Sequence, residues 1–177
     1  QIQTDPPIEN VHGRTLAAGE WRQFEAREAF RLGASKPVML VQYMVGSNWL
    51  GIPRICDEGI DAANPTGIGD PAMALSVPMS QYRTDYFITV PKAYAQDYIN
   101  IAAPVGVRVE IDGEPIPDEL WKPVGTRGEL ETATVEVDDG FHKLTSDTPF
   151  GVTGYGYDCH VSYAYPGGLN LETEVDR

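Results

Sequence analysis

The sequence predicts an all-β protein, arranged as an antiparallel two-sheet β-sandwich with loops rich in glycine and proline. Its 177 residues include 18 Gly and 14 Pro, spread between short apolar runs, which is typical of many short strands joined by turns. Residues 107–112 (VRVEID) alternate β-branched and charged side chains, as expected for a half-buried antiparallel strand. Residues 134–138 and 141–144 flank Asp139-Gly140, and this pattern predicts a β-hairpin.

The remaining segments are assigned by their apolar content. Residues 20–32 are rich in good helix formers, but their large apolar side chains do not follow a helical spacing. A helix and a pair of strands are therefore both compatible with this segment. Residues 58–71 form the longest predicted loop. Further strands are predicted at residues 37–45, 73–77, 86–90, 98–102 and 151–165.

The run at residues 151–165 is the most informative of these. Alternate positions between Tyr155 and Tyr165 carry four tyrosines and Cys159. On one continuous strand these side chains would share a face, and such an aromatic face would pack against a second sheet.

The composition limits the class of protein and its partners. Apolar residues make up 42% of the chain, and the length suits a single domain, residues 1–177, which we expect to be excised from a larger protein. The net charge of -13 disfavours nucleic acid and anionic membrane surfaces as partners. The longest strongly apolar run, residues 38–41, is far shorter than a membrane span, so no membrane insertion is expected.

The two cysteines, Cys56 and Cys159, are 103 positions apart. In an exported protein two distant cysteines usually pair, so we predict a Cys56–Cys159 disulfide. Two separate buried thiols are the alternative.

Catalytic and metal motifs are not found in the sequence. The three histidines are scattered, and no zinc-binding spacing or nucleophile elbow is present. Acidic residues supply weak calcium candidates, but they lack the EF-hand spacing. These candidates are Asp57, Glu58, Asp61, Asp138 and Asp139. We therefore expect neither an enzyme nor a cofactor or metal.

Exposed aromatic residues on loops are frequent anchors in recognition. Trp49, beside Asn48, and Trp121 are the candidates for such anchors, although most aromatic residues in such positions are lids on the core. The predicted binding loops are residues 47–49, 58–69 and 114–128. Residues 110–139 hold ten acidic side chains against Lys122 and Arg127, a pattern that favours a basic patch on any partner.

Several blocks of the sequence, found together, resemble the N-terminal domain family of IgGFc-binding proteins. The blocks are GDPAMALSVP (69–78), QYRTDYFITVP (81–91), PFGV (149–152), YGY (155–157) and SYAYPGG (162–168). The similarity extends over residues 28–168. It implies an extracellular, non-enzymatic, β-rich module, but supplies no binding residue that could be transferred to this chain.

The combined prediction is a non-catalytic recognition or adhesion module of a secreted or cell-surface multidomain protein. Its ligand would be a protein or a glycan at a cell surface. A carbohydrate-binding module or glycoside-active domain is one alternative. A purely structural spacer is the other.

Overall fold

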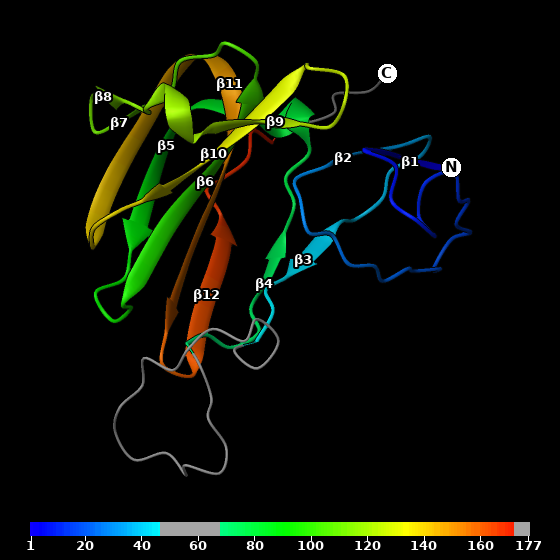
Figure 1. The fold of residues 1–177 in the computed structure, drawn as a ribbon, viewed down its shortest axis with the longest axis horizontal. Coiled ribbons are helices and arrows are strands. Elements are labelled where there is room, and N and C mark those ends of the chain that lie inside the picture. Colours follow the sequence, from blue (N-terminus) through cyan, green and yellow to red (C-terminus); the bar gives the residue numbers. More distant parts are fainter. Residues whose placement is uncertain (47–67, 172–177) are drawn as a thin grey trace.

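A computed structural model describes residues 1–46 and 68–171 of the chain (Figure 1). Within these ranges, helix is confined to two three-residue 3₁₀ turns, η1 (Met79–Gln81) and η2 (Asp118–Leu120). The strands are β1 (Ile2–Asp5), β2 (Arg31–Ala34), β3 (Val41–Tyr43), β4 (Met73–Leu75), β5 (Arg83–Val90), β6 (Gln96–Pro104), β7 (Glu110–Ile111), β8 (Glu114–Pro115), β9 (Trp121–Val124), β10 (Leu130–Glu136), β11 (Gly140–Asp158) and β12 (Val161–Pro166). Every strand pairing is antiparallel, which confirms the all-β antiparallel class.

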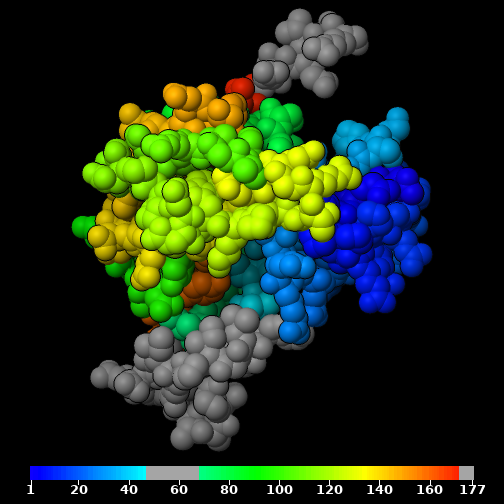
Figure 2. Space-filling model, turned by 45° about the horizontal axis from the view of Figure 1, so that its top comes forward, coloured from blue at the N-terminus to red at the C-terminus, as the bar shows by residue number. Residues whose placement is uncertain are grey.

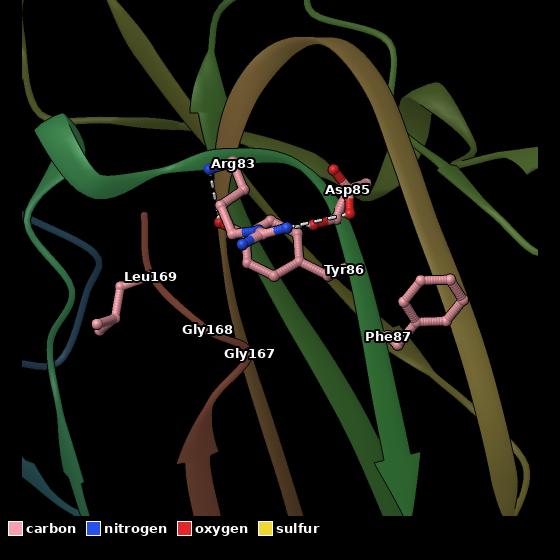
Figure 3. Close-up of a pocket in the computed structure, with 7 residues that line it drawn as sticks. All are labelled: Arg83, Asp85, Tyr86, Phe87, Gly167, Gly168 and Leu169. Atoms are coloured by element: carbon pink, nitrogen blue, oxygen red, sulfur yellow. Dashed lines mark hydrogen bonds and ion pairs between the residues drawn. The ribbon is translucent and has the colours of Figure 1, made fainter. Parts of the chain in front are cut away.

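The main sheet has eight strands and is organised by the 19-residue strand β11. The first part of β11 pairs with β5 and β7, and its second part pairs with β6 and β12. The register with β5 is irregular between Thr145 and Phe150, and here β11 arches over from one side of the sheet to the other (Figures 1 and 3). The curled sheet therefore has two arms. The first arm contains β5, β7 and β8, and the second contains β6, β9, β10 and β12.

The hydrophobic core is built by inward-facing residues from both arms. Strand β5 alternates buried and exposed positions from Tyr86 to Val90, and β6 alternates in the same way around Ile99 and Ile101. Leu144 and Phe150, on either side of the bend in β11, are both 0% exposed. This strict two-residue period explains why the apolar runs of the sequence fold as strands with one face in the core.

One turn was predicted correctly and one predicted hairpin is wrong. Asp112-Gly113 joins β7 to β8, and both residues have positive φ, as a two-residue hairpin turn requires. By contrast, β10 pairs with β6 and β9, while the start of β11 pairs with β5. The chain at Asp139-Gly140 therefore passes from one arm to the other and does not close a hairpin between adjacent partners.

The predicted single tyrosine face is divided between two faces. Strand β11 ends at Asp158, and β12 returns after a turn in which His160 has a φ of 59°. Because Tyr163 lies opposite Gly156, and Tyr165 opposite Gly154, these two rings cover the glycines on the core side. Tyr155 and Tyr157 point the other way, together with Tyr98.

The glycine side of β11 encloses a buried carboxyl group. Asp97 on β6 is 4% exposed and accepts a hydrogen bond of 2.6 Å from the Tyr163 hydroxyl. Burial raises the pKa of Asp97, and the Tyr163 hydrogen bond only partly offsets this effect. Burial, followed by the hydrogen bond to Asp97, raises the pKa of Tyr163, so the phenol keeps its proton.

The N-terminal two-stranded sheet β1–β2 is attached to the second arm by polar contacts. The Asp5 carboxylate accepts hydrogen bonds from the Thr126 backbone N–H (3.0 Å) and hydroxyl (2.8 Å), in the turn between β9 and β10. Arg31 forms an ion pair with Glu129 in the same turn. Figure 2 shows the N-terminal segment, in blue, packed against this yellow turn.

Residues 20–30 form neither the helix nor the strand pair that the sequence allowed. They have no regular secondary structure, and β2 begins only at Arg31. Trp21 is 77% exposed, so this segment lacks the apolar packing that would stabilise a short helix.

Replacing Gly156 by alanine is expected to destabilise the fold by about 1–3 kcal/mol, because the new Cβ would lie 2.4 Å from Asp97 Oδ1 and 2.5 Å from the Tyr163 ring. The matched control is Gly33→Ala, since a Cβ on Gly33 meets nothing within 4 Å. Denaturant unfolding of the two variants measures the difference. Equal stabilities would contradict the close packing at Gly156.

Candidate protein-binding face

The outer surface of the first arm presents two large aromatic side chains. Phe87 on β5 is 71% exposed and Phe141 on β11 is 82% exposed. Phe87 lies directly opposite Lys143, and Phe141 lies opposite Thr89, so the two rings are diagonal neighbours on one face. We call this surface, made of Phe87, Thr89, Phe141 and Lys143, the β5–β11 face.

The β5–β11 face is supported from beneath by the core. Tyr86, Ile88 and Leu144 occupy the alternate positions of the same two strands and are all buried. Strand geometry therefore fixes Phe87 and Phe141 outward while their neighbours are held in the core. Exposed aromatic residues on such a rigid element lose little conformational entropy on binding.

A shallow pocket of about 140 Å³ lies beside Phe87, at the start of β5. Arg83, Asp85, Tyr86, Phe87 and residues 167–169 line it. Figure 3 shows the Tyr86 and Phe87 rings on opposite sides of β5, with Leu169 on the Tyr86 side. The pocket therefore opens on the Tyr86 side of β5 and adjoins the β5–β11 face only at the start of this strand, where Arg83 and Asp85 supply charged groups.

Hydrogen bonds hold the wall of this pocket in place. The Tyr86 hydroxyl donates to the Phe150 carbonyl (2.5 Å) and accepts from the Arg83 backbone N–H (2.9 Å). Burial raises the pKa of Tyr86, so its hydroxyl remains a donor at neutral pH. The Arg83 guanidinium contacts both the carboxylate and the backbone carbonyl of Asp85.

The open edge of β5 is partly closed by side chains. Arg83 donates to the Asp85 carbonyl, and the Tyr165 hydroxyl donates to the Thr89 carbonyl at 2.8 Å. These carbonyls flank Phe87 on the side of β5 that faces away from β11. Such capping protects an edge strand against pairing with another chain, so the exposed rings offer better binding surface than the strand edge.

A second apolar surface lies on the two-stranded ribbon β3–β4. Its registers place Tyr43 opposite Met73 and Val41 opposite Leu75, and Tyr43 and Met73 are 68% and 57% exposed. This ribbon forms a sheet of its own, outside the eight-stranded sheet. It is therefore less rigidly supported than the β5–β11 face.

The binding anchors predicted from the sequence are placed only in part. Trp49 and Asn48 lie outside the described residues. Trp121, at the start of β9, is partly buried and packs against the core, which favours its interpretation as a lid. The aromatic residues that the structure exposes, Phe87 and Phe141, were not selected by sequence reasoning.

The cysteine and calcium predictions also fall partly outside the described ranges. Asp57, Glu58, Asp61 and Cys56 lie there, so the disulfide and these ligand candidates stay predictions. Asp138 and Asp139 are exposed at the turn between β10 and β11. Within residues 1–46 and 68–171, no group of three His, Cys, Asp or Glu side chains is arranged to hold a metal ion.

A parity signal in the sequence could have identified Phe87 and Phe141. In residues 86–90, Tyr86, Ile88 and Val90 occupy alternate positions and face the core. This alternation leaves Phe87 on the outer face, together with the exposed Thr89. In the same way, Leu144 places Phe141 and Lys143 outward. Two large aromatic residues that are neighbours on the outward face of paired strands form an exposed apolar patch, and such a patch can mark an interaction site.

The fold and this face define a β-sheet protein with a rigid, exposed aromatic surface. Comparison with known families shows that the chain belongs to the family described as IgGFc binding protein, which matches residues 1–156. No curated protein and no solved structure matches the chain significantly. A search of the described residues for a helix that is both long and apolar enough to span a membrane finds none.

Removing the Tyr86 hydroxyl is expected to loosen the wall of the pocket. The Tyr86→Phe variant should lose about 1–3 kcal/mol of unfolding free energy, because the buried Phe150 carbonyl loses its donor. Tyr43→Phe, on an exposed ring, is the matched control and should change stability by less than about 0.5 kcal/mol. Chemical denaturation compares the two, and a Tyr86→Phe variant as stable as its control would show that this hydrogen bond is dispensable.

Proposed function

We propose that this chain is a non-catalytic, extracellular recognition module that binds a protein ligand through the β5–β11 face. The observation that carries the proposal is the pair of exposed rings, Phe87 and Phe141, on the core-supported arm of a protein in the IgGFc binding protein family. The family description makes the Fc fragment of immunoglobulin G the first ligand to test.

The arrangement of charges supports a protein ligand. Lys143 lies opposite Phe87 and two positions along β11 from Phe141, and Arg83 and Asp85 line the adjacent pocket. A partner with apolar side chains at its centre and acidic groups near Lys143 would match this surface. The acidic side chains of residues 110–139 would favour basic groups at the rim of the contact.

The module is proposed to act as one unit, residues 1–177, with the two arms as the layers of a β-sandwich. The shared core supports this arrangement, because β5 from one arm and β6 and β10 from the other contribute to the same cluster. The contacts of Asp5 and Arg31 with the β9–β10 turn attach the N-terminal two-stranded sheet β1–β2 to the second arm. In a larger secreted or surface protein such a unit would present a fixed binding face for adhesion.

Truncating both rings tests the location of the binding face. In the Phe87→Ala/Phe141→Ala variant, affinity for the Fc fragment is expected to fall at least about 10-fold, since buried aromatic anchors often contribute 2 kcal/mol or more. Unfolding free energy should change by less than about 0.5 kcal/mol for each exposed position. Surface plasmon resonance at low and moderate salt measures the affinity, and higher salt is expected to weaken it.

The matched control for this experiment is Trp21→Ala, which removes an exposed aromatic ring from the N-terminal segment. It should bind like the unmodified protein. Failure of the unmodified protein to bind Fc would remove immunoglobulin as its ligand. Binding that survives loss of both phenylalanines would move the site away from the β5–β11 face.

The disulfide Cys56–Cys159 belongs to the same proposal, because it is expected of an exported protein. No cysteine among the described residues is free. Ile68 forms a β-bridge with Cys159, and the Gly69 N–H donates to the Asp158 carbonyl at 2.8 Å. Ile68, which is twelve positions after Cys56, is thus held beside Cys159. A chain of twelve residues is long enough to let Cys56 reach Cys159.

Labelling with a thiol reagent in denaturant tests this pairing. Without reductant we expect no modified cysteine, and after reduction we expect both Cys56 and Cys159 to be modified. Mass spectrometry counts the labels. Two labels before reduction would contradict the disulfide and weaken the case for an oxidising compartment.

A further inference from the structure

His142 occupies an unusual position at the margin of the core. It lies on β11 opposite Ile88, on the inward face, and its side chain is 12% exposed. Its Nδ1 lies 2.7 Å from Asp112 Oδ2, in the turn between β7 and β8. Its Nε2 lies 2.7 Å from the backbone carbonyl oxygen of Asp138, in the segment between β10 and β11.

The chemistry of these two partners determines the protonation of the ring. A backbone carbonyl only accepts hydrogen bonds, and an ionised carboxylate also only accepts. A neutral imidazole carries one N–H and satisfies one of the two, whereas an imidazolium donates to both. The geometry around His142 therefore selects the doubly protonated ring.

Asp112 is itself held in its ionised form. Its Oδ1 accepts the backbone N–H of Lys143 at 2.8 Å, while its own N–H donates to the Lys143 carbonyl. The Lys143 hydrogen bond, followed by that from His142, lowers the pKa of Asp112. The shared proton thus resides on the imidazole and not on the carboxylate.

The charges that act on His142 come from both turns packed against it. Partial burial would lower the pKa of His142, but hydrogen bonds to the Asp138 carbonyl and Asp112 carboxylate, with the charges of these two aspartates, raise it. Its neighbours on β11 are Phe141 and Lys143, whose side chains point to the opposite face. The charges around His142 are therefore negative, and they favour the protonated imidazolium form of its ring.

We propose that protonated His142 is a pH-dependent clamp that holds the β7–β8 turn and the β10–β11 segment against β11. Deprotonation removes one of the two N–H donors and the ionic attraction to Asp112, so the clamp opens as the pH rises. The segment that it releases leads directly into Phe141.

The pH window follows from the signs of the two shifts. A raised histidine pKa stabilises the fold fully below the unfolded value of 6.5, and this contribution is lost as pH rises through the folded pKa. The lowered pKa of Asp112 contributes above 3.8 and is lost as pH falls through its folded value. The clamp is therefore closed in mildly acidic solution and opens as the pH rises through the folded pKa of His142, which lies above 6.5.

Two variants and one spectroscopic measurement test the clamp. The stability advantage of the unmodified protein over His142→Gln should be larger near about pH 5.5 than near about pH 8.5, as measured by denaturant midpoints. Asp112→Asn keeps a residue that tolerates the positive φ of this turn but removes the charge, and it should lower the pKa of His142 in an NMR titration.

Each outcome is decisive. A His142 that titrates at or below 6.5 in the folded protein overturns the clamp, as does a stability difference that is the same at both pH values. If His142→Gln does not fold, the NMR titrations of the unmodified protein and Asp112→Asn still decide. None of these measurements depends on the ligand, so they stand or fall independently of the proposed binding function.

Discussion

The continuity of β11 through its bend is the constraint on which the rest of the structure depends. This one strand provides hydrogen-bonding partners for four others, β5, β6, β7 and β12. A strand that bends between two arms must bury side chains from both, and Phe150 at the bend is fully buried against Tyr86 (ring centroids 5.1 Å apart). The Tyr86 hydroxyl bound to the Phe150 carbonyl fastens β5 to the same point.

The bend also explains where glycine is needed. Beyond Phe150, Gly154 and Gly156 occupy core-side positions of β11 and Gly151 lies on its other face. A Cβ at Gly151 or Gly156 would collide with a tyrosine ring, and one at Gly154 would be in very tight contact with another. Tyr82, Tyr165 and Tyr163 fill these spaces in turn, so the bulk comes from neighbouring segments and not from β11 itself. Aromatic rings laid over strand glycines restore the packing that glycine alone would forfeit.

Much of the fold class could be predicted from the sequence, because two-residue alternation reports directly which side chains are buried. Val107, Val109 and Ile111 do face the core, and Asp112-Gly113 does form the turn. Alternation does not report which strand is the hydrogen-bonding partner, and for this reason the hairpin at Asp139-Gly140 was wrong. The same limit applies to the tyrosines, whose division between two faces depends on a turn at Cys159-His160 that lacks a glycine.

The candidate site was harder to predict for a related reason. The sequence suggested tryptophans near loops as binding anchors, but Trp121 packs on the core. Phe87 and Phe141, in contrast, are exposed within regular strands. Phe87 and Phe141 are candidates only because they occupy the outward positions of their strands. Which positions point outward is certain only when the opposite face of the sheet is known to be buried. Local alternation can place each ring outward, but only the pairing of β5 with β11 makes the two rings neighbours on one face.

Several acidic residues of the chain form specific contacts that stabilise the fold. Asp5 binds the β9–β10 turn, Asp97 is buried with Tyr163, and Asp112 holds Lys143 and His142. In each case a carboxyl group connects segments that are far apart in sequence. Asp5 and Asp112 have lowered pKa values and favour folding at neutral pH, whereas Asp97 has a raised pKa and opposes folding as it ionises. The pH dependence of stability is therefore a balance between these groups and His142, and it differs from that of a uniformly charged surface.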